Sequence, residues 1–273
     1  MPDDLRFSYI GGPTALIERF GLRLLTDPGF DPAGAQFHSG TYILQRTQGP
    51  ALRPESLQPI DAVLLSHDHH FDNLDESGRR FLPLAGRVLT TKAGAARLGG
   101  NAIGLEPWDS FTIPSPNGGD VVITATPARH GPAGADRGPV IGFVINRPDV
   151  PGATYISGDT VWYEGIEEIA RRFLIRHAFL FMGAARVQAV GPQHLTLTAQ
   201  EGVQVAHAMP DALIIPLHFE GWQHFTEGRP AIEQAFRTAG LGARLIWGTP
   251  GVSIRLEPQS PPLAHGSSES PLP

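Results

Sequence analysis

A dense group of side chains that can bind metal ions lies between residues 67 and 75. The segment is His-Asp-His-His-Phe-Asp-Asn-Leu-Asp, so nine residues contain three histidines, three aspartates and one asparagine. It directly follows the apolar run 62–65, which is typical of a buried strand. Ring nitrogens and carboxylates at this density are costly to desolvate without a cation between them. The segment therefore predicts a divalent-metal site, with a purely structural polar network as the alternative.

Three further apolar runs end in a residue of the same chemical type. These runs and the donors that follow them are 121–126 with His130, 153–156 with Asp159, and 213–217 with His218. In open α/β sheets, ligands gather beyond the carboxyl ends of the strands. Each strand end alone is a weak signal, but four of them together predict one shared metal site.

The elements that must position these donors form an α/β pattern. Apolar runs predict strands, and segments with spaced apolar residues predict helices. The expected strands are 7–10, 15–17, 22–25, 62–65, 121–126, 140–145, 153–156, 178–181, 213–217 and 244–247, and the expected helices are 92–98, 164–173, 199–209 and 229–239. Strands followed by helices indicate a layered α/β domain, and the early strands without helices indicate an antiparallel part of the sheet.

No repeat or linker interrupts residues 1–257, so we expect one domain there. Residues 258–273 are rich in proline and serine and are predicted to form a disordered tail.

Composition narrows the classes of partner. The chain has 273 residues, a formal net charge of −6 and no basic run, which argues against a nucleic-acid partner. It contains no cysteine, which excludes disulfides and sulfur-ligated zinc. The first residues lack the layout of a signal peptide, and no apolar run reaches the length of a membrane span. We therefore expect a cytoplasmic protein with a small-molecule substrate, and a homo-oligomer is compatible with the sequence.

In the order of these landmarks the chain resembles the metallo-β-lactamase superfamily, over about residues 5–250. It looks closest to the branch of ascorbate-phosphate lactonase-like and N-acyl-phosphatidylethanolamine phospholipase-like hydrolases. The segments that carry the resemblance are Tyr9-Ile10-Gly11-Gly12, Leu24-Leu25-Thr26-Asp27-Pro28, Leu65-Ser66-His67-Asp68, Thr126-Pro127-Ala128-Arg129-His130, Gly158-Asp159-Thr160 and Pro216-Leu217-His218. The resemblance implies an αββα sandwich with one or two divalent metal ions between its two sheets.

The main motif departs from the usual run of that family, which is His-any-His-any-Asp-His. Aligned backwards from Asp72, the chain has Asp68, His70, Asp72 and Asn73 at the four ligand positions. Aligned forwards, His67 and His69 take the two histidine positions, but Phe71 then falls on the aspartate. We prefer the backward register. The resemblance adds His130 to the first metal site, Asp159 as a bridge between the two ions and His218 to the second site.

Oxygen donors are unusually frequent in this predicted ligand set. Oxygen ligands shift the preference of a site towards harder ions such as manganese or iron. We expect zinc or manganese, with iron as a third option. Asn73 is neutral and a weak ligand, which predicts a loose or empty second site.

The resemblance implies a hydrolase in which a metal-activated water attacks a small ester, lactone, amide or phosphodiester. Asp72 is the predicted group that orients this water, and His194 or His224 is predicted to protonate the leaving group. His194 could instead anchor the turn before a helix, and His224 could brace its loop. Two other functions compete: an iron-dependent redox relative of the same fold, and a non-catalytic binding protein.

Overall fold

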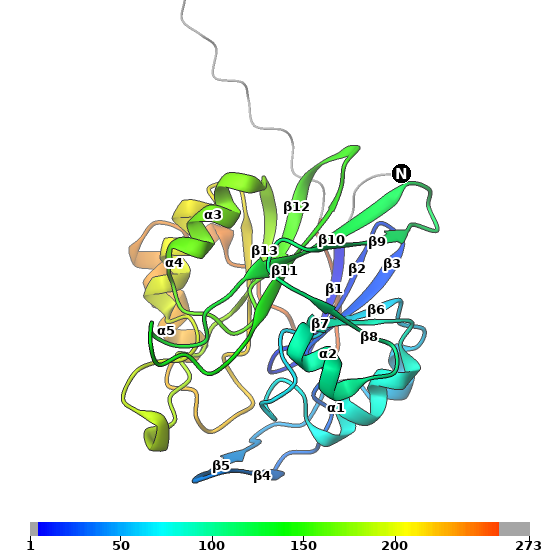
Figure 1. The fold of residues 1–273 in the computed structure, drawn as a ribbon. Helices are drawn as coiled ribbons and strands as arrows, with labels where there is room; N and C mark the ends of the chain where they lie inside the picture. The colour runs from blue at the N-terminus through cyan, green and yellow to red at the C-terminus, as the bar shows by residue number, and fades with distance from the viewer. Residues whose placement is uncertain (1–4, 257–273) are drawn as a thin grey trace, which may run out of the picture.

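Two β-sheets pack face to face in the computed structural model, which describes residues 5–256, and helices cover both outer faces (Figure 1). In spatial order the first sheet contains β15 (Ser253–Leu256), β1 (Leu5–Gly11), β2 (Thr14–Arg19), β3 (Leu22–Thr26), β6 (Ala62–Leu64), β7 (Val88–Thr91) and β8 (Ala102–Leu105). The second contains β14 (Leu213–Leu217), β13 (Ile175–Phe181), β12 (Val150–Ile156), β11 (Ile141–Arg147), β10 (Asp120–Pro127) and β9 (Ser110–Pro114). The expected αββα sandwich of class α/β is confirmed.

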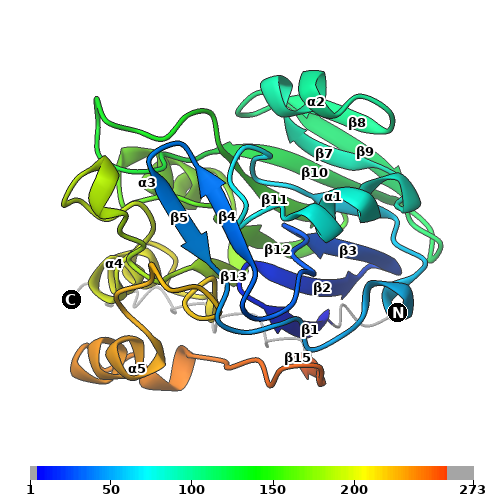
Figure 2. The ribbon, with the colours of Figure 1, turned by 90° about the horizontal axis from the view of Figure 1, so that it is seen from below.

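The helices divide between the two outer faces (Figures 1 and 2). The second sheet is covered by α3 (Glu164–Arg172), α4 (Ala199–Ala208) and α5 (Arg229–Thr238), and the first carries α1 (Glu76–Phe81) and α2 (Lys92–Leu98). Short 3-10 helices are η1 (Pro54–Leu57), η2 (Leu82–Leu84), η3 (Gln188–Val190) and η4 (Gly242–Arg244). Four of the five α-helices lie where the sequence predicted them. A capping box formed by Thr198 and Glu201 begins α4.

The central strands are apolar over most of their length because both of their faces are buried. In β13, Phe179 points into the core between the sheets, where its ring lies 5.4 Å from that of Phe7 in β1. Its neighbours Ala178 and Leu180 point outward, into the layer between the second sheet and its helices. This two-sided burial explains why short unbroken apolar runs identified these strands.

Strand direction brings the predicted donors to one edge of the sandwich. In the second sheet β12, β13 and β14 are parallel, and β10 runs the same way because both β10 and β12 are antiparallel to β11. In the first sheet β6 is parallel to β3. The metal-type donors follow the carboxyl ends of β6, β10, β12 and β14.

A separate hairpin, β4 (Gln36–Ser39) and β5 (Tyr42–Gln45), projects from the sandwich (Figure 1). Its end is tied to the loop after β14, since Gln223 N donates to Gln45 O at 3.0 Å and Arg46 pairs with Trp222 in an isolated bridge.

Some expectations differ from the structure. The predicted strand 244–247 does not form; Leu245 makes a single bridge to Ile214 and otherwise packs against the helical layer. The sequence did not predict α1, the hairpin, β7 to β9 or β15. In residues 5–256 no helix combines the length and apolar character needed to cross a bilayer. The predicted tail, 258–273, lies outside the described residues.

Gly78 in α1 faces the backbone so closely that any side chain should be damaging. A Cβ built there would lie 1.8 Å from the carbonyl oxygen of Pro28. We expect Gly78→Ala to lower the free energy of unfolding by about 3 kcal/mol or more, although alanine is the better helix former by about 1 kcal/mol. Denaturant titration measures this loss. Gly202→Ala in α4 is the control, because its Cβ would meet side chains, 2.3 Å from Cε of the flexible Met182 and 3.4 Å from the ring of Phe236, and no backbone atom; equal losses at both positions would contradict the argument.

Candidate metal centre

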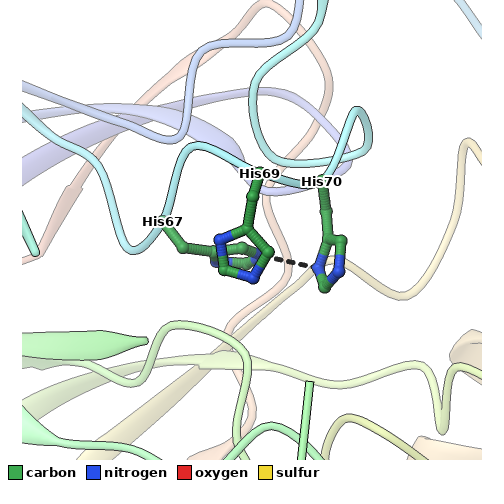
Figure 3. Close-up of side chains that lie close together, drawn as sticks. All are labelled: His67, His69 and His70. Atoms are coloured by element: carbon green, nitrogen blue, oxygen red, sulfur yellow. Dashed lines mark hydrogen bonds between the residues drawn. The ribbon is translucent and has the colours of Figure 1, made fainter. Parts of the chain in front are cut away.

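Three histidine rings converge where β6 and β10 end. Nε2 of His67 lies 2.9 Å from Nδ1 of His70, and Nε2 of His130 lies 3.2 Å from the same atom. His67 and His70 come from the loop after β6 (Figure 3), and His130 comes from the loop after β10. Three ring nitrogens this close, from two sheets, form the first donor group.

Asp159, directly after β12, lies between this group and a second one. Its Oδ2 is 3.5 Å from Nε2 of His130 and 4.0 Å from Nε2 of His67. Its Oδ1 is 3.3 Å from Nδ1 of His218, and Nε2 of His218 is 3.4 Å from Oδ2 of Asp72. One carboxylate therefore faces two donor groups, as a bridging ligand does.

The histidines of the first group are in the protonation state that binds metals. Burial, with positive neighbours adding to it, lowers the pKa of His70 to about 2. Burial likewise lowers the pKa of His130 to about 4 and holds the pKa of His67 well below its ordinary value. Neutral imidazole has a free ring lone pair, so at neutral pH all three rings offer one to a cation.

Several buried polar atoms in the second group have no hydrogen-bond partner within residues 5–256. They are both ring nitrogens of His218, Oδ1 of Asp159 and both amide atoms of Asn73. Buried polar groups are nearly always paired, so such a cluster requires an explanation. Burial and the nearby Asp72 also raise the pKa of Asp159 well above its usual value. A divalent cation would satisfy these atoms and favour both ionised carboxylates, so the residues fit a metal site.

The main motif combines parts of both registers. His67, from the forward register, meets His70, Asp72 and Asn73, from the backward one, so two residues instead of one separate the first two histidines. The preferred placement of Asp68 at a ligand position disagrees with its contacts. Its carboxylate binds the guanidinium of Arg97 through both oxygens, with Oδ2 2.8 Å from Nε. The extra residue in the loop turns Asp68 towards α2 and His67 towards the metal centre.

His69 lies beside His67 and His70 of the first group (Figure 3). Its ring nitrogens do not make the closest contacts of that group. Its Nε2 donates to the carbonyl oxygen of Arg137 at 2.8 Å, which leaves a lone pair on Nδ1. That atom is buried and has no partner in the described chain. With His67 and His70 it forms a further set of nitrogens that could hold an ion.

Polar groups behind the ligands fix which ring nitrogen is free. Ser66 Oγ donates to Oδ1 of Asp27 at 2.7 Å, so at 2.9 Å it must accept from Nδ1 of His67. Nδ1 of His130 donates to Leu195 O at 2.8 Å. Both rings are thus held with an unprotonated Nε2 towards the metal centre. From the sequence, Asp27 could either bond to backbone near the site or start the Asp-Pro-Gly turn. The role of Ser66 was missed, although its position directly before His67 was an available signal.

Removal of the Ser66 hydroxyl should weaken metal binding without removing a ligand. Ser66→Ala leaves Nδ1 of His67 without its acceptor, so we expect metal affinity to fall by about 10- to 100-fold. Competition with a chromophoric chelator measures the affinity. Ser56→Ala, on the exposed η1, is the control and should bind metal as the wild type does. Equal affinities for both variants would show that Ser66 does not orient His67.

The two histidines predicted as proton donors lie in different places. His224, in the loop after β14, has Nε2 3.0 Å from Oδ2 of Asp72 and is part of the centre. His194 bonds Oε1 of Glu201 at 3.0 Å. The structure brings Asp72 and His224 together and places His194 behind them, before α4, as the alternative interpretation proposed.

The His194–Glu201 pair predicts a pH-dependent contribution to stability. The hydrogen bond that His194 donates to the carboxylate of Glu201 raises the pKa of His194 above its ordinary value of about 6.5. A group with a raised pKa in the folded state stabilises fully below its unfolded pKa and loses that contribution as pH rises through its folded pKa. His194→Gln should therefore lower the free energy of unfolding by about 0.5–1 kcal/mol at pH 5.5, and the loss should shrink towards pH 9. Urea titrations at both pH values test this, and a loss that grows with pH would contradict it.

Two cavities flank the centre. One, of about 570 Å³, is bounded by the hairpin residues Tyr42, Ile43 and Leu44 and by the segment 186–189, and it reaches His224. The other, of about 520 Å³, lies between the start of α2 and the loop after β10, and it reaches His130. A substrate can approach the two donor groups from either side.

Comparison with known proteins agrees with this geometry. The family model described as "Beta-lactamase superfamily domain" matches residues 22–219. The UPF0173 protein YddR of Bacillus subtilis is 23% identical over 253 residues, which cover 89% of this chain and 96% of that protein. N-acyl-phosphatidylethanolamine-hydrolyzing phospholipase D 1 of Caenorhabditis elegans is 27% identical over 134 residues, 45% of this chain and 37% of that protein.

A solved structure has the same architecture. Isothiocyanate hydrolase from Delia radicum gut bacteria superposes with a TM-score of 0.78 at 21% sequence identity, covering 93% of this chain and all of that one. At this identity the likeness establishes the fold, whereas the family model covers most of the sequence. The chain belongs to the metallo-β-lactamase superfamily.

Proposed function

We propose that the protein is a hydrolase that uses two divalent metal ions to cleave a small ester, lactone, amide or phosphodiester. The observation that carries this proposal is the position of Asp159, whose two oxygens face two separate donor groups. The first group would hold one ion through His67, His70 and His130. The second would hold another through Asp72 and His218, with Asp159 shared between the ions.

When bound, the ions would supply a water nucleophile at neutral pH and polarise the oxygen of the scissile bond. Asp72 is placed to orient that nucleophile and accept its proton. Burial opposes its ionisation, but the neighbouring His218 and His224 favour the charged form and hold the pKa of Asp72 well below the ordinary value. The carboxylate therefore stays ionised, as a proton acceptor must be.

The cavity beside His224 is the proposed substrate pocket. The hairpin lines it with Tyr42, Ile43 and Leu44, Arg186 is its charged lining residue, and three glutamines and His224 add further polar groups. Small-molecule pockets combine apolar surface with polar groups that fix the orientation of the ligand. Such a pocket suits a substrate that has both an apolar arm and hydrogen-bonding groups next to the bond that is cleaved.

A metal-dependence screen tests the proposal. Protein stripped with a chelator and reloaded with zinc or manganese should hydrolyse at least one class in a panel of esters, lactones, amides and phosphodiesters. Activity should disappear on stripping and return with metal. Asp72→Asn protein, purified in the same way, controls for contaminating hydrolases.

Two outcomes would replace the proposal. Loaded protein that hydrolyses no class would favour the non-catalytic alternative. Purified protein that holds only iron and consumes oxygen in the presence of a reductant would favour the redox alternative.

A further inference from the structure

The second donor group is one strong ligand short. Asp72, Asp159 and His218 supply it with three donors, whereas the first group has four when the shared Asp159 is counted. Asn73 is the next residue in the loop, but its neutral amide is a weak ligand for divalent ions. Both of its polar atoms are buried and unpaired within the described residues. A stronger fourth donor would complete the group.

His224 lies where such a donor is needed. Its Nε2 is 3.0 Å from Oδ2 of Asp72, and Nε2 of His218 is 3.4 Å from the same oxygen. Ligand atoms bound to one tetrahedral ion at 2.0–2.1 Å lie about 3.3–3.4 Å apart, so both rings can share an ion with Asp72. The His224 side chain is only 10% exposed, and its Nδ1 has no hydrogen-bond partner in residues 5–256.

The loop after β14 holds this ring in position. His224 O accepts from Arg186 N at 2.9 Å, and Gln223 N donates to the end of the hairpin. The ring packs against Phe225, with 4.7 Å between centroids. At the start of the loop His218 has φ of +53°, a conformation that non-glycine residues seldom adopt and that recurs at functional sites. One strained, tethered loop thus presents both rings to Asp72.

We propose that His224 is a ligand of the second ion through Nε2 and takes the coordination position that Asn73 fills poorly. This inference rests on the proposed two-ion centre. It gives the loop 218–224 two ligands and explains why an asparagine can stand at the end of the main motif. It also places the second ion directly against the cavity lined by the hairpin, because His224 lines that cavity.

Zinc titration of four proteins tests this assignment: the wild type, His224→Gln, Asn73→His combined with His224→Gln, and His207→Gln. Glutamine can still donate a hydrogen bond to Asp72 but is a poor ligand, so it separates coordination from hydrogen bonding. His207 is an exposed residue of α4 and serves as the matched control. Zinc affinities are measured by calorimetry against a competing chelator, with circular dichroism to check folding.

We expect two ions in the wild type and in His207→Gln. In His224→Gln the second ion should bind at least about 100-fold more weakly while the first is unchanged, because loss of a ligand exceeds the 10- to 100-fold effect of a residue behind the ligands. The added histidine of the double variant should restore the second ion. Wild-type affinities for both ions in His224→Gln, or a wild type with one ion, would overturn the assignment, whereas a wild type without ions would overturn the proposed function itself.

If His224→Gln does not fold, a crystal structure of the zinc-loaded wild type decides. A distance of about 2.0–2.1 Å from Nε2 of His224 to the second ion supports the assignment, and a distance beyond hydrogen-bonding contact overturns it.

Discussion

Asp159→Ala is expected to remove about one ion or more per chain, and the remaining metal should bind weakly. Asp159 is 1% exposed, and its two oxygens lie 3.5 Å from His130 and 3.3 Å from His218. Loss of a bridging carboxylate removes a bond to each ion and leaves their mutual repulsion less compensated. Elemental analysis of the purified variant measures the effect, with circular dichroism to confirm that it is folded.

His194→Ala is the comparison for this variant. His194 contacts Glu201 and lies behind the donor groups, so its loss should reduce metal affinity or activity by about 10- to 100-fold at most and leave both ions at saturating metal. An Asp159 variant with both ions, together with a His194 variant without them, would reverse the assignment of ligands.

Asp72→Asn changes only one functional group, and we expect it to lower turnover strongly. The substitution keeps the shape of the side chain but removes the charge that would accept the proton of the nucleophile. Positioned proton acceptors contribute about 10²- to 10⁴-fold to rate, and we expect a loss of kcat in that range on whichever substrate the screen identifies. The first ion should remain, because His67, His70 and His130 are untouched.

Asp68→Asn, in the same loop, is the matched control. Its carboxylate binds Arg97 and points away from the donor groups, so metal content and kcat should stay near wild type. If Asp68→Asn lost metal, the placement of Asp68 as a ligand in the backward register would be restored.

The metal-type donors that the sequence predicted at strand ends come together in the structure. His130, Asp159 and His218 each follow an apolar strand, and the carboxyl ends of these strands share one edge because β10, β12 and β14 point the same way. This part of the site depends on local pattern and on a general property of α/β sheets. It was therefore accessible without coordinates.

The register of the main motif could not be predicted from the sequence, for a physical reason. Whether Asp68 or His67 faces the centre depends on Arg97, 29 positions further along and on a different element. Spacing alone cannot show that a loop contains one additional residue, because turns absorb such a residue without changing the flanking strands. His194 was ambiguous for the same reason, since its partner Glu201 lies seven positions further along, in the first turn of α4.

The missed elements are short or mixed in polarity. The hairpin strands have four residues each, with single buried apolar side chains, Phe37 and Leu44, that pack on Trp222. Such strands give little periodic signal. The false strand 244–247 has the opposite cause: Leu245 and Trp247 are apolar because they cover the helical layer, without ladder pairing.

Metal content is the most direct test of the account, which holds that two donor groups joined by Asp159 bind divalent ions. Elemental analysis of protein purified without added metal, followed by thermal denaturation with and without zinc or manganese, is the measurement. We expect up to about two zinc, manganese or iron ions per chain, and a lower melting temperature after stripping that recovers when metal returns. Protein that contains no transition metal, and whose melting temperature no added divalent ion changes, would contradict the metal centre and the hydrolase derived from it.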